Sequence, residues 1–310
     1  MHFFQKITLL ALIFFLFACS DKPADKTDDE SHPSFSELPE ITKESGQDFA
    51  QAVVPIAILP EDQEKADKAP EGMVFIKGGC FIMGNDYTQA DEKPEHEVCL
   101  SDFYMDKFEV TQERWEKVMG FNPSKFSGAN LPVEQVNYQN IQKFIKKSGG
   151  NCRLPTEAEW EYVARANTSS STYTGNIEQQ GSNNAPDLDE IAWYSGNSEA
   201  LYKGGKYCDD WEDKQFQAIR CGTQEVGKKQ PNLWGLYDMI GNVWELTEDW
   251  YGSYSSRVRH DPKGKQSGDL KVARGGNWAD SLQQNRAAAR YGFAVKERSN
   301  NLGFRLVVLD

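Results

Sequence analysis

The sequence predicts a single loop-rich domain with one core, made of short strands and short helices and preceded by a polar N-terminal segment. The hydrophobic fraction is modest at 39%, yet 8 Trp, 12 Tyr and 17 Phe among 310 residues can fill an aromatic core. The apolar stretches are short, and Asn, Ser, Gly and Asp dominate from about residue 163 to about residue 230. This composition favours one loop-rich domain over a helical bundle.

The N-terminus has the features of a bacterial lipoprotein signal. A short basic start leads into an apolar run from Ile7 to Phe17, which is too short to span a bilayer as a mature helix. The segment Leu16-Phe17-Ala18-Cys19 resembles the lipobox, whose cysteine is acylated and becomes the first residue of the mature protein. We expect residues 1–18 to be a signal peptide and Cys19 to be lipidated. The alternative is an ordinary signal peptide with an incidental cysteine.

The residue after this cysteine indicates where the anchor would be sorted. Ser20, in place of Asp, resembles the signal for the outer membrane of a Gram-negative cell. The predicted location is therefore the cell envelope, with the lipid anchor in the outer membrane as the membrane contact.

Residues 19–70 are expected to be a disordered tether. They are rich in Asp, Glu, Lys, Ser and Pro and poor in aromatics, so they cannot bury enough apolar surface to offset the entropy of ordering. The globular domain is then residues 71–310. The net charge of -13 argues against nucleic acid as a partner, because proteins that bind nucleic acids present basic surfaces.

Four short strands are predicted at the start of the domain. Residues 73–76 and 80–84 are apolar runs around Gly78-Gly79, a pattern that favours a hairpin between them. Residues 97–100 and 103–105 continue the strand-like pattern.

Three helix starts follow. Thr111 is a candidate N-cap, with Trp115 on one face of the helix that follows. Asn137 is a second candidate, before a stripe that includes Phe144. Thr156 and Glu159 form a capping box, in which each side chain bonds the backbone N–H of the other residue. We interpret this third motif as structural.

The cysteines predict two disulfides. An exported protein meets oxidising conditions, and Cys80 and Cys99 lie in neighbouring predicted strands. Cys208 and Cys221 bracket a loop that has little other reason to be ordered, and closing it would contribute about 3 kcal/mol. Cys152 is left over, either as an inert buried thiol or as a reactive thiol near a helix start.

Four ordered blocks carry a family resemblance. They are Arg153–Tyr162, Asn232–Glu245, Arg274–Trp278 and Asn301–Arg305. In this order they resemble the formylglycine-generating enzyme, or sulfatase-modifying factor, superfamily. The resemblance extends from about Gly72 to Arg305. It implies a compact α+β domain of low secondary-structure content, related to the C-type lectin fold.

The catalytic pair that the resemblance implies is missing. In the enzymes a Cys-x4-Cys pair holds a copper ion, which activates oxygen to convert a substrate cysteine into formylglycine. Counted from Gly275-Gly276, its positions are occupied by Asp280 and Asn285. Oxygen ligands do not select Cu(I) as thiolates do. The histidines His96 and His260 are far apart in sequence. We therefore expect no bound copper and no catalytic residues at these positions.

A calcium site is also implied by the resemblance. The enzymes bind calcium in a Leu-Tyr-Asn-x-x-Gly-Asn-x-Trp-Glu turn. The matching ligands here are the side chains of Asp238 and Glu245 and the carbonyls of Gly241 and Val243. Carboxylate and carbonyl oxygens suit this hard cation. The alternative is a metal-free turn held by its own hydrogen bonds.

Arginines cluster in the C-terminal blocks. Arg274, Arg286 and Arg290 could line the groove in which the enzymes hold their peptide substrate, or they could form salt bridges to the many carboxylates.

The function predicted from these observations is that of an envelope lipoprotein and pseudoenzyme. Its domain would bind a peptide, a glycan or another envelope protein without redox chemistry. One alternative is an oxidoreductase of the formylglycine-generating or non-haem iron type with a divergent metal site. Another is an oxidase that uses Cys152 or Cys221 as its thiol, which would require the cysteine used to be free.

Overall fold

The computed structural model describes residues 60–309. The signal peptide, Cys19 and the tether as far as residue 59 lie outside the described residues. Helix α1 (Pro60–Asp67) occupies the stretch where the tether was expected to continue. Lys65 of this helix pairs with Asp102 at 2.8 Å, and Asp62 pairs with Lys77 at 2.8 Å. The expected boundary at residue 70 is therefore too late, because these ion pairs dock the helix on the domain.

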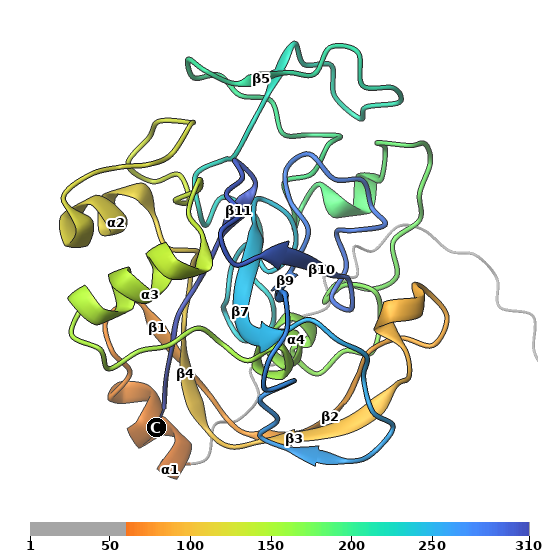
Figure 1. Ribbon diagram of the computed structural model, residues 1–310. Helices are drawn as coiled ribbons and strands as arrows, with labels where there is room; N and C mark the ends of the chain where they lie inside the picture. The colour runs from red at the N-terminus through yellow and green to blue at the C-terminus, as the bar shows by residue number, and fades with distance from the viewer. Residues whose placement is uncertain (1–59, 310) are drawn as a thin grey trace, which may run out of the picture. The chain divides into compact units, whose positions relative to one another are not determined.

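A four-stranded sheet lies in the middle of the domain, as Figure 1 shows. Its strands, in spatial order, are β10 (Arg290–Ala294), β9 (Leu270–Arg274), β7 (Trp244–Trp250) and β11 (Leu302–Gly303). β9 is antiparallel to both β10 and β7, whereas β11 runs parallel to β7.

Two three-stranded sheets surround it. The first contains β1 (Met73–Ile76), β4 (Phe103–Asp106) and β12 (Val307–Leu309). The second contains β2 (Gly79–Met83), β3 (His96–Leu100) and β8 (Arg259–His260). A small ribbon pairs β5 (Lys206–Tyr207) with β6 (Arg220–Cys221).

The four predicted strands at the start of the domain exist, but the predicted hairpin is wrong. β1 pairs with β4, and β2 pairs with β3, so β1 and β2 are successive halves of one bent ribbon. The bend falls at Gly78, whose N–H donates to Asp102 Oδ1 at 2.7 Å. A Cβ on Gly78 would lie 2.3 Å from the carbonyl oxygen of Leu100. The backbone at Gly78 and the backbone at Leu100 therefore lie too close together for any residue with a side chain at position 78.

All three predicted helix starts are confirmed. α2 (Gln112–Met119) is capped by Thr111, and α3 (Tyr138–Lys147) is capped by Asn137. α4 (Glu157–Arg165) begins at the Thr156–Glu159 capping box. Two 3-10 turns, Ala90–Glu92 and Pro186–Leu188, complete the helical segments of the described chain.

Helix α4 is the centre of the core, because every one of its residues is buried. It packs against β2, β7 and β9. Trp160 belongs to the apolar cluster around it, whereas Trp115 and Trp244 belong to a second cluster beneath α2 and α3. Among residues 60–309, no helix combines the length and the apolar composition needed to cross a membrane.

Candidate functional site

The two positions of the implied cysteine pair lie in one hydrogen-bonded turn. The side-chain amide of Asn285 donates to the carbonyl oxygens of Asp280 and Ser281, at 2.9 and 2.8 Å. The Asp280 carboxylate accepts a hydrogen bond from the side chain of Asn277. Asn285 is fully buried, and burial raises the pKa of Asp280 to about 6. Both side chains are thus engaged in holding the turn.

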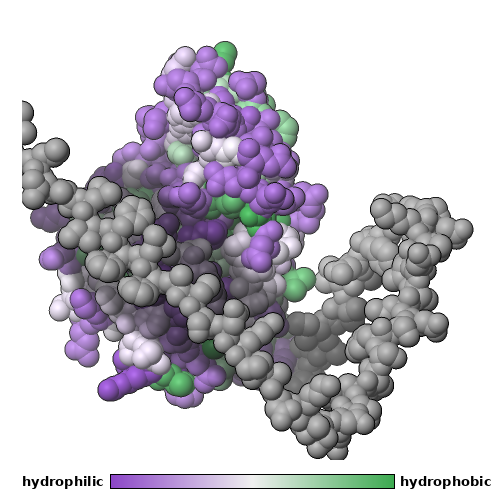
Figure 2. Space-filling model, turned by 90° about the vertical axis from the view of Figure 1, so that its right-hand side faces the viewer, coloured by the Kyte–Doolittle hydropathy of each residue, from purple (hydrophilic) through white to green (hydrophobic). Residues whose placement is uncertain are grey.

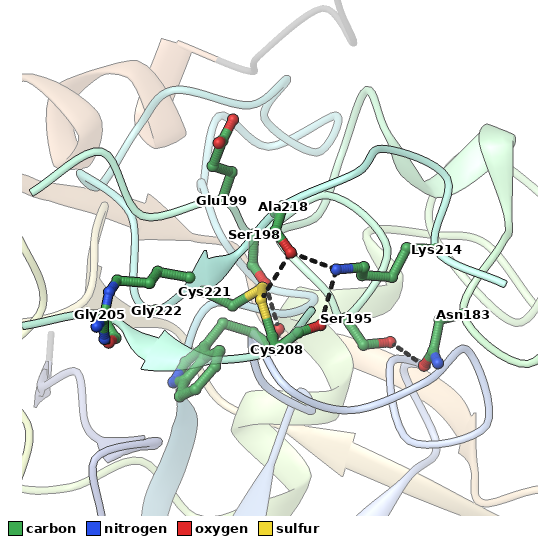
Figure 3. The surroundings of a disulfide bond; sticks show 12 residues. Asn183, Ser195, Ser198, Glu199, Gly205, Cys208, Lys214, Ala218, Cys221 and Gly222 are labelled. Atoms are coloured by element: carbon green, nitrogen blue, oxygen red, sulfur yellow. Dashed lines mark hydrogen bonds between the residues drawn. A yellow bond between two sulfur atoms is a disulfide. The ribbon is translucent and has the colours of Figure 1, made fainter. Parts of the chain in front are cut away.

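A disulfide-bonded lobe, residues 199–221, packs against this turn. Trp211 of the lobe stacks on Trp278 with ring centroids 6.0 Å apart. Next to the lobe, Ser198 donates to the carbonyl oxygen of Trp278 at 2.7 Å. Figure 3 shows Cys208 and Cys221 joined inside the lobe, with the ammonium of Lys214 directed at the carbonyls of Cys208 and Ala218.

Both predicted disulfides are present. Cys80 faces Cys99 directly across β2 and β3 and is bonded to it. Cys208 is bonded to Cys221, so Cys221 cannot serve as the free thiol of a retained oxidase.

Cys152 is the one free cysteine of the described chain and is half-buried. Its sulfur lies 3.8 Å from the hydroxyl of Ser148. It lines a cavity with Arg153 and Glu248, whereas Asp280 does not contribute to that cavity.

The predicted calcium turn brings Asp238 and Glu245 close to one guanidinium. Asp238 is buried with a φ of +54°, and its Oδ2 accepts from the N–H of Gly227 at 2.7 Å. Its Oδ1 is buried without a hydrogen-bond partner. Glu245 forms a bidentate pair with Arg305, with both contacts at 2.7 Å, and accepts from the indole N–H of Trp160 at 2.8 Å.

Sequence reasoning missed Glu109, a third carboxylate of this site. It accepts from the N–H of Val243 at 3.1 Å and from the side chain of Asn242 at 2.6 Å. Burial, followed by the charges of Asp238 and Glu245, raises its pKa well above the ordinary value. Because its partners are more than 130 residues away in sequence, no local pattern marks it.

The donor set fits calcium in part. The orphaned Oδ1 of Asp238 is a hard oxygen without a partner, which suits a cation. Glu245 is already engaged by Arg305 at both oxygens, which limits it as a ligand. In the described chain no three His, Cys, Asp or Glu side chains are grouped to hold a metal, so a calcium ion would depend on the backbone carbonyls. Calcium binding at Asp238, Gly241, Val243 and Glu245 stays a prediction.

The C-terminal arginines form buried ion pairs, the second of the two alternatives above. Arg286 pairs with Glu92 at 2.6 Å, and Arg290 pairs with Glu157 at 2.7 Å. Arg274 is completely buried and pairs with Glu161 of α4. Arg290 also lines a cavity beside β8.

Residues 59–309 match the family model described as "Sulfatase-modifying factor enzyme 1-like domain". "Chaperone protein LppX" of Paenibacillus barcinonensis is 30% identical over 270 residues, which covers 75% of this chain and 86% of its own length. The formylglycine-generating enzyme of Streptomyces coelicolor is 27% identical over 305 residues, covering 77% and 89% of the two chains.

A solved structure shares the fold. Treponema denticola variable protein 1 is 29% identical with a TM-score of 0.63, over 77% of this chain and 95% of that one. The α+β fold predicted from the four blocks is thereby confirmed. Because the family model spans the whole described domain, the chain belongs to the sulfatase-modifying factor enzyme 1-like family.

Proposed function

We propose that this protein is a non-catalytic member of its family that binds another exported protein or peptide. The observation that carries the proposal is the turn from Asp280 to Asn285. Its two key side chains are hydrogen-bonded within the turn, and neither provides the thiolate that copper-dependent oxidation of a cysteine requires.

The lobe of residues 199–221 supplies a surface for such a partner. Four of its large apolar side chains are exposed: Leu201 by 90%, Tyr207 by 55%, Phe216 by 50% and Ile219 by 64%. Figure 2 shows green apolar atoms among purple ones at its upper end, the level of the β5 ribbon in Figure 1. The four side chains belong to one segment closed by a disulfide. Exposed apolar side chains of this kind can contact another polypeptide, which favours a protein or peptide over a glycan.

The similarity to a protein named as a chaperone supports the same role. A lipid anchor on Cys19 would keep the domain at the cell envelope, and calcium at the Asp238 turn would stabilise it. Both are part of the proposal.

The chemical half of the proposal is tested by metal content and oxygen uptake. The intact protein is loaded with copper, or separately with iron, and mixed with a cysteine-bearing peptide. We expect no oxygen consumption. A double variant, Asp280→Cys with Asn285→Cys, is the matched control that restores the pair and should retain Cu(I). Near one copper or iron per wild-type chain with turnover would overturn the proposal.

The binding half is tested on the lobe. We expect the protein to slow the aggregation of a reduced, unfolded model protein, and the double variant Leu201→Ser, Phe216→Ser to lose most of this effect. Leu233→Ser is the control, because Leu233 is 53% exposed but lies outside the lobe. Equal protection by the wild type and the lobe variant would exclude the lobe as the binding surface.

A further inference from the structure

A second candidate site lies at the opposite end of β7 from the Asp280 turn. Trp244, whose side chain interacts with Asp280, begins the strand. Asp249 and Trp250, at its end, line a cavity of about 280 Å³. Neither Asp280 nor Asn285 lines this cavity, so it is separate from the family's cysteine-pair position.

The rim of this cavity is basic in an acidic protein. The chain carries a net charge of -13, but residues 251–268 contain four Lys and Arg and a single Asp. That Asp261 is already engaged, since it accepts from the N–H and hydroxyl of Ser101 at 2.8 and 2.7 Å. Arg259, Lys263 and Lys265 line the cavity and form no ion pair or hydrogen bond through their side chains with the described residues.

The rim is held in place by the fold. Arg259 and His260 form β8 and pair with Val98 and Cys99 of β3, beside the Cys80–Cys99 disulfide. Gly264 has a φ of +63°, and a Cβ on it would lie 2.4 Å from Asp249 Oδ1. The loop is therefore pressed against the inner wall, so that the cations are carried on an anchored segment.

The negative charge of the two inner-wall carboxylates, Glu157 and Asp249, is reduced by their surroundings. Glu157 is neutralised by Arg290, at 2.8 and 2.7 Å, and accepts from the hydroxyl of Tyr254 at 2.9 Å. Burial, followed by the charge of Glu157, raises the pKa of Asp249 to about 7. Asp249 therefore carries less than a full negative charge near neutral pH.

The wall also offers aromatic surface. The ring of Tyr254 lies against that of His96 with centroids 4.9 Å apart, and both residues line the cavity with Ser253 and Ser255. Such a wall can pack against the organic part of a ligand while the hydroxyls and cations hold its charged group.

We propose that this cavity binds a phosphate monoester. Three uncompensated cations, two imidazoles and two serine hydroxyls match the charge and the several acceptor oxygens of a phosphate dianion better than those of a single carboxylate. The volume admits a phosphate carrying a small organic group. Either a soluble ester or the headgroup of an anionic phospholipid can present this chemistry.

Calorimetry on the intact protein tests the proposal, with glycerol 3-phosphate as the probe and glycerol as the neutral control. We expect saturable binding of the phosphate ester only. In the variant Arg259→Gln, Lys263→Gln the Kd should rise by about tenfold or more. Lys146→Gln, Lys147→Gln removes the same charge from exposed positions of α3 and should leave the Kd unchanged.

Sedimentation with vesicles distinguishes the two sources. Stronger binding to vesicles that contain phosphatidic acid than to pure phosphatidylcholine, lost in the rim variant, identifies a lipid headgroup. Binding of glycerol 3-phosphate without vesicle binding identifies a soluble ester. Absence of both, or equal weakening by the rim variant and the α3 variant, would overturn the proposal.

Discussion

The negative charge of Glu134 lowers the stability of the folded state. Its side chain is fully buried; Oε1 accepts from the N–H of Phe126 at 2.8 Å, while Oε2 has no partner. Burial raises its pKa to about 7. The native state therefore holds this proton up to a higher pH than the unfolded chain, and the contribution of Glu134 to stability falls as pH rises from about 4.5 to about 7.

The variant Glu134→Gln should consequently gain stability at high pH. Compared with the wild type, we expect it to be more stable by about 1 to 3 kcal/mol at pH 8, with the difference shrinking towards pH 5. Urea unfolding at the two pH values measures this. Exposed Glu116→Gln is the control. A difference that does not change with pH would contradict the assignment.

Asp238 gives the sharper test of calcium. Replacing Glu245 would leave Arg305 buried without its partner, so it would destabilise the protein whether or not calcium binds. Asp238 instead has one oxygen free of partners. If calcium binds, it should raise the Tm of the wild type by several degrees over chelator and raise that of Asp238→Asn much less. Identical wild-type Tm values with calcium and with chelator would exclude the site.

At the scale of elements, helix α4 forms several of the buried ion pairs of the core. Its Glu157 pairs with Arg290 of β10, and its Glu161 pairs with Arg165 and with Arg274 of β9. Arg274 also donates to the carbonyl oxygens of residues 287–289. The helix is thereby tied to two strands of the central sheet by charge as well as by apolar packing.

Removing Arg274 should therefore be costly. We expect Arg274→Met to lower the free energy of unfolding by about 3 to 5 kcal/mol, because Glu161 keeps its charge with one guanidinium fewer. Adding Glu161→Gln should recover part of this loss. A double-mutant cycle by chemical denaturation measures the coupling. Additive effects of the two substitutions would show that the pair is not coupled.

The sequence was most informative where the signals are local. Thr156 and Glu159 lie three residues apart and mark the start of α4, and Asn137 marks the start of α3. The pairing of β1 with β4 joins residues that are 27 to 33 positions apart, and the neighbouring apolar runs suggested the wrong partner. Glu109 was missed for the same reason, and the sequence allowed salt bridges of the arginines without identifying the carboxylates, because only the fold brings these partners together.

At the scale of the whole molecule, two disulfides secure opposite ends of the domain. One crosslinks β2 to β3, and the other closes the lobe that packs on Trp278. The cysteine pattern predicted both pairs. The basic composition of residues 251–268 is visible in the sequence. That these residues line a cavity is not, because the cavity needs β8 to lie beside β3.

A thiol count tests this arrangement directly. Denatured without reductant, a chain acylated at Cys19 should show one reactive thiol, from Cys152. Ellman's reagent measures this, and prior reduction should raise the count to five. Three or more thiols before reduction would show that a disulfide is absent. Replacing both Cys208 and Cys221 by Ser should lower stability by about 3 kcal/mol.

The buried ion pairs also determine when this chain can fold. Glu92, Glu157 and Glu161 are synthesised early, whereas Arg274, Arg286 and Arg290 follow more than a hundred residues later. Arg305, which neutralises Glu245, comes later still. A nascent chain that lacks these arginines would have to bury Glu92 and Glu157 without an ion-pair partner and Glu161 with Arg165 alone, so we expect it to stay unfolded. If the chain is exported, as the proposed lipid anchor on Cys19 requires, this delay keeps it able to pass through a channel that admits only unfolded chains.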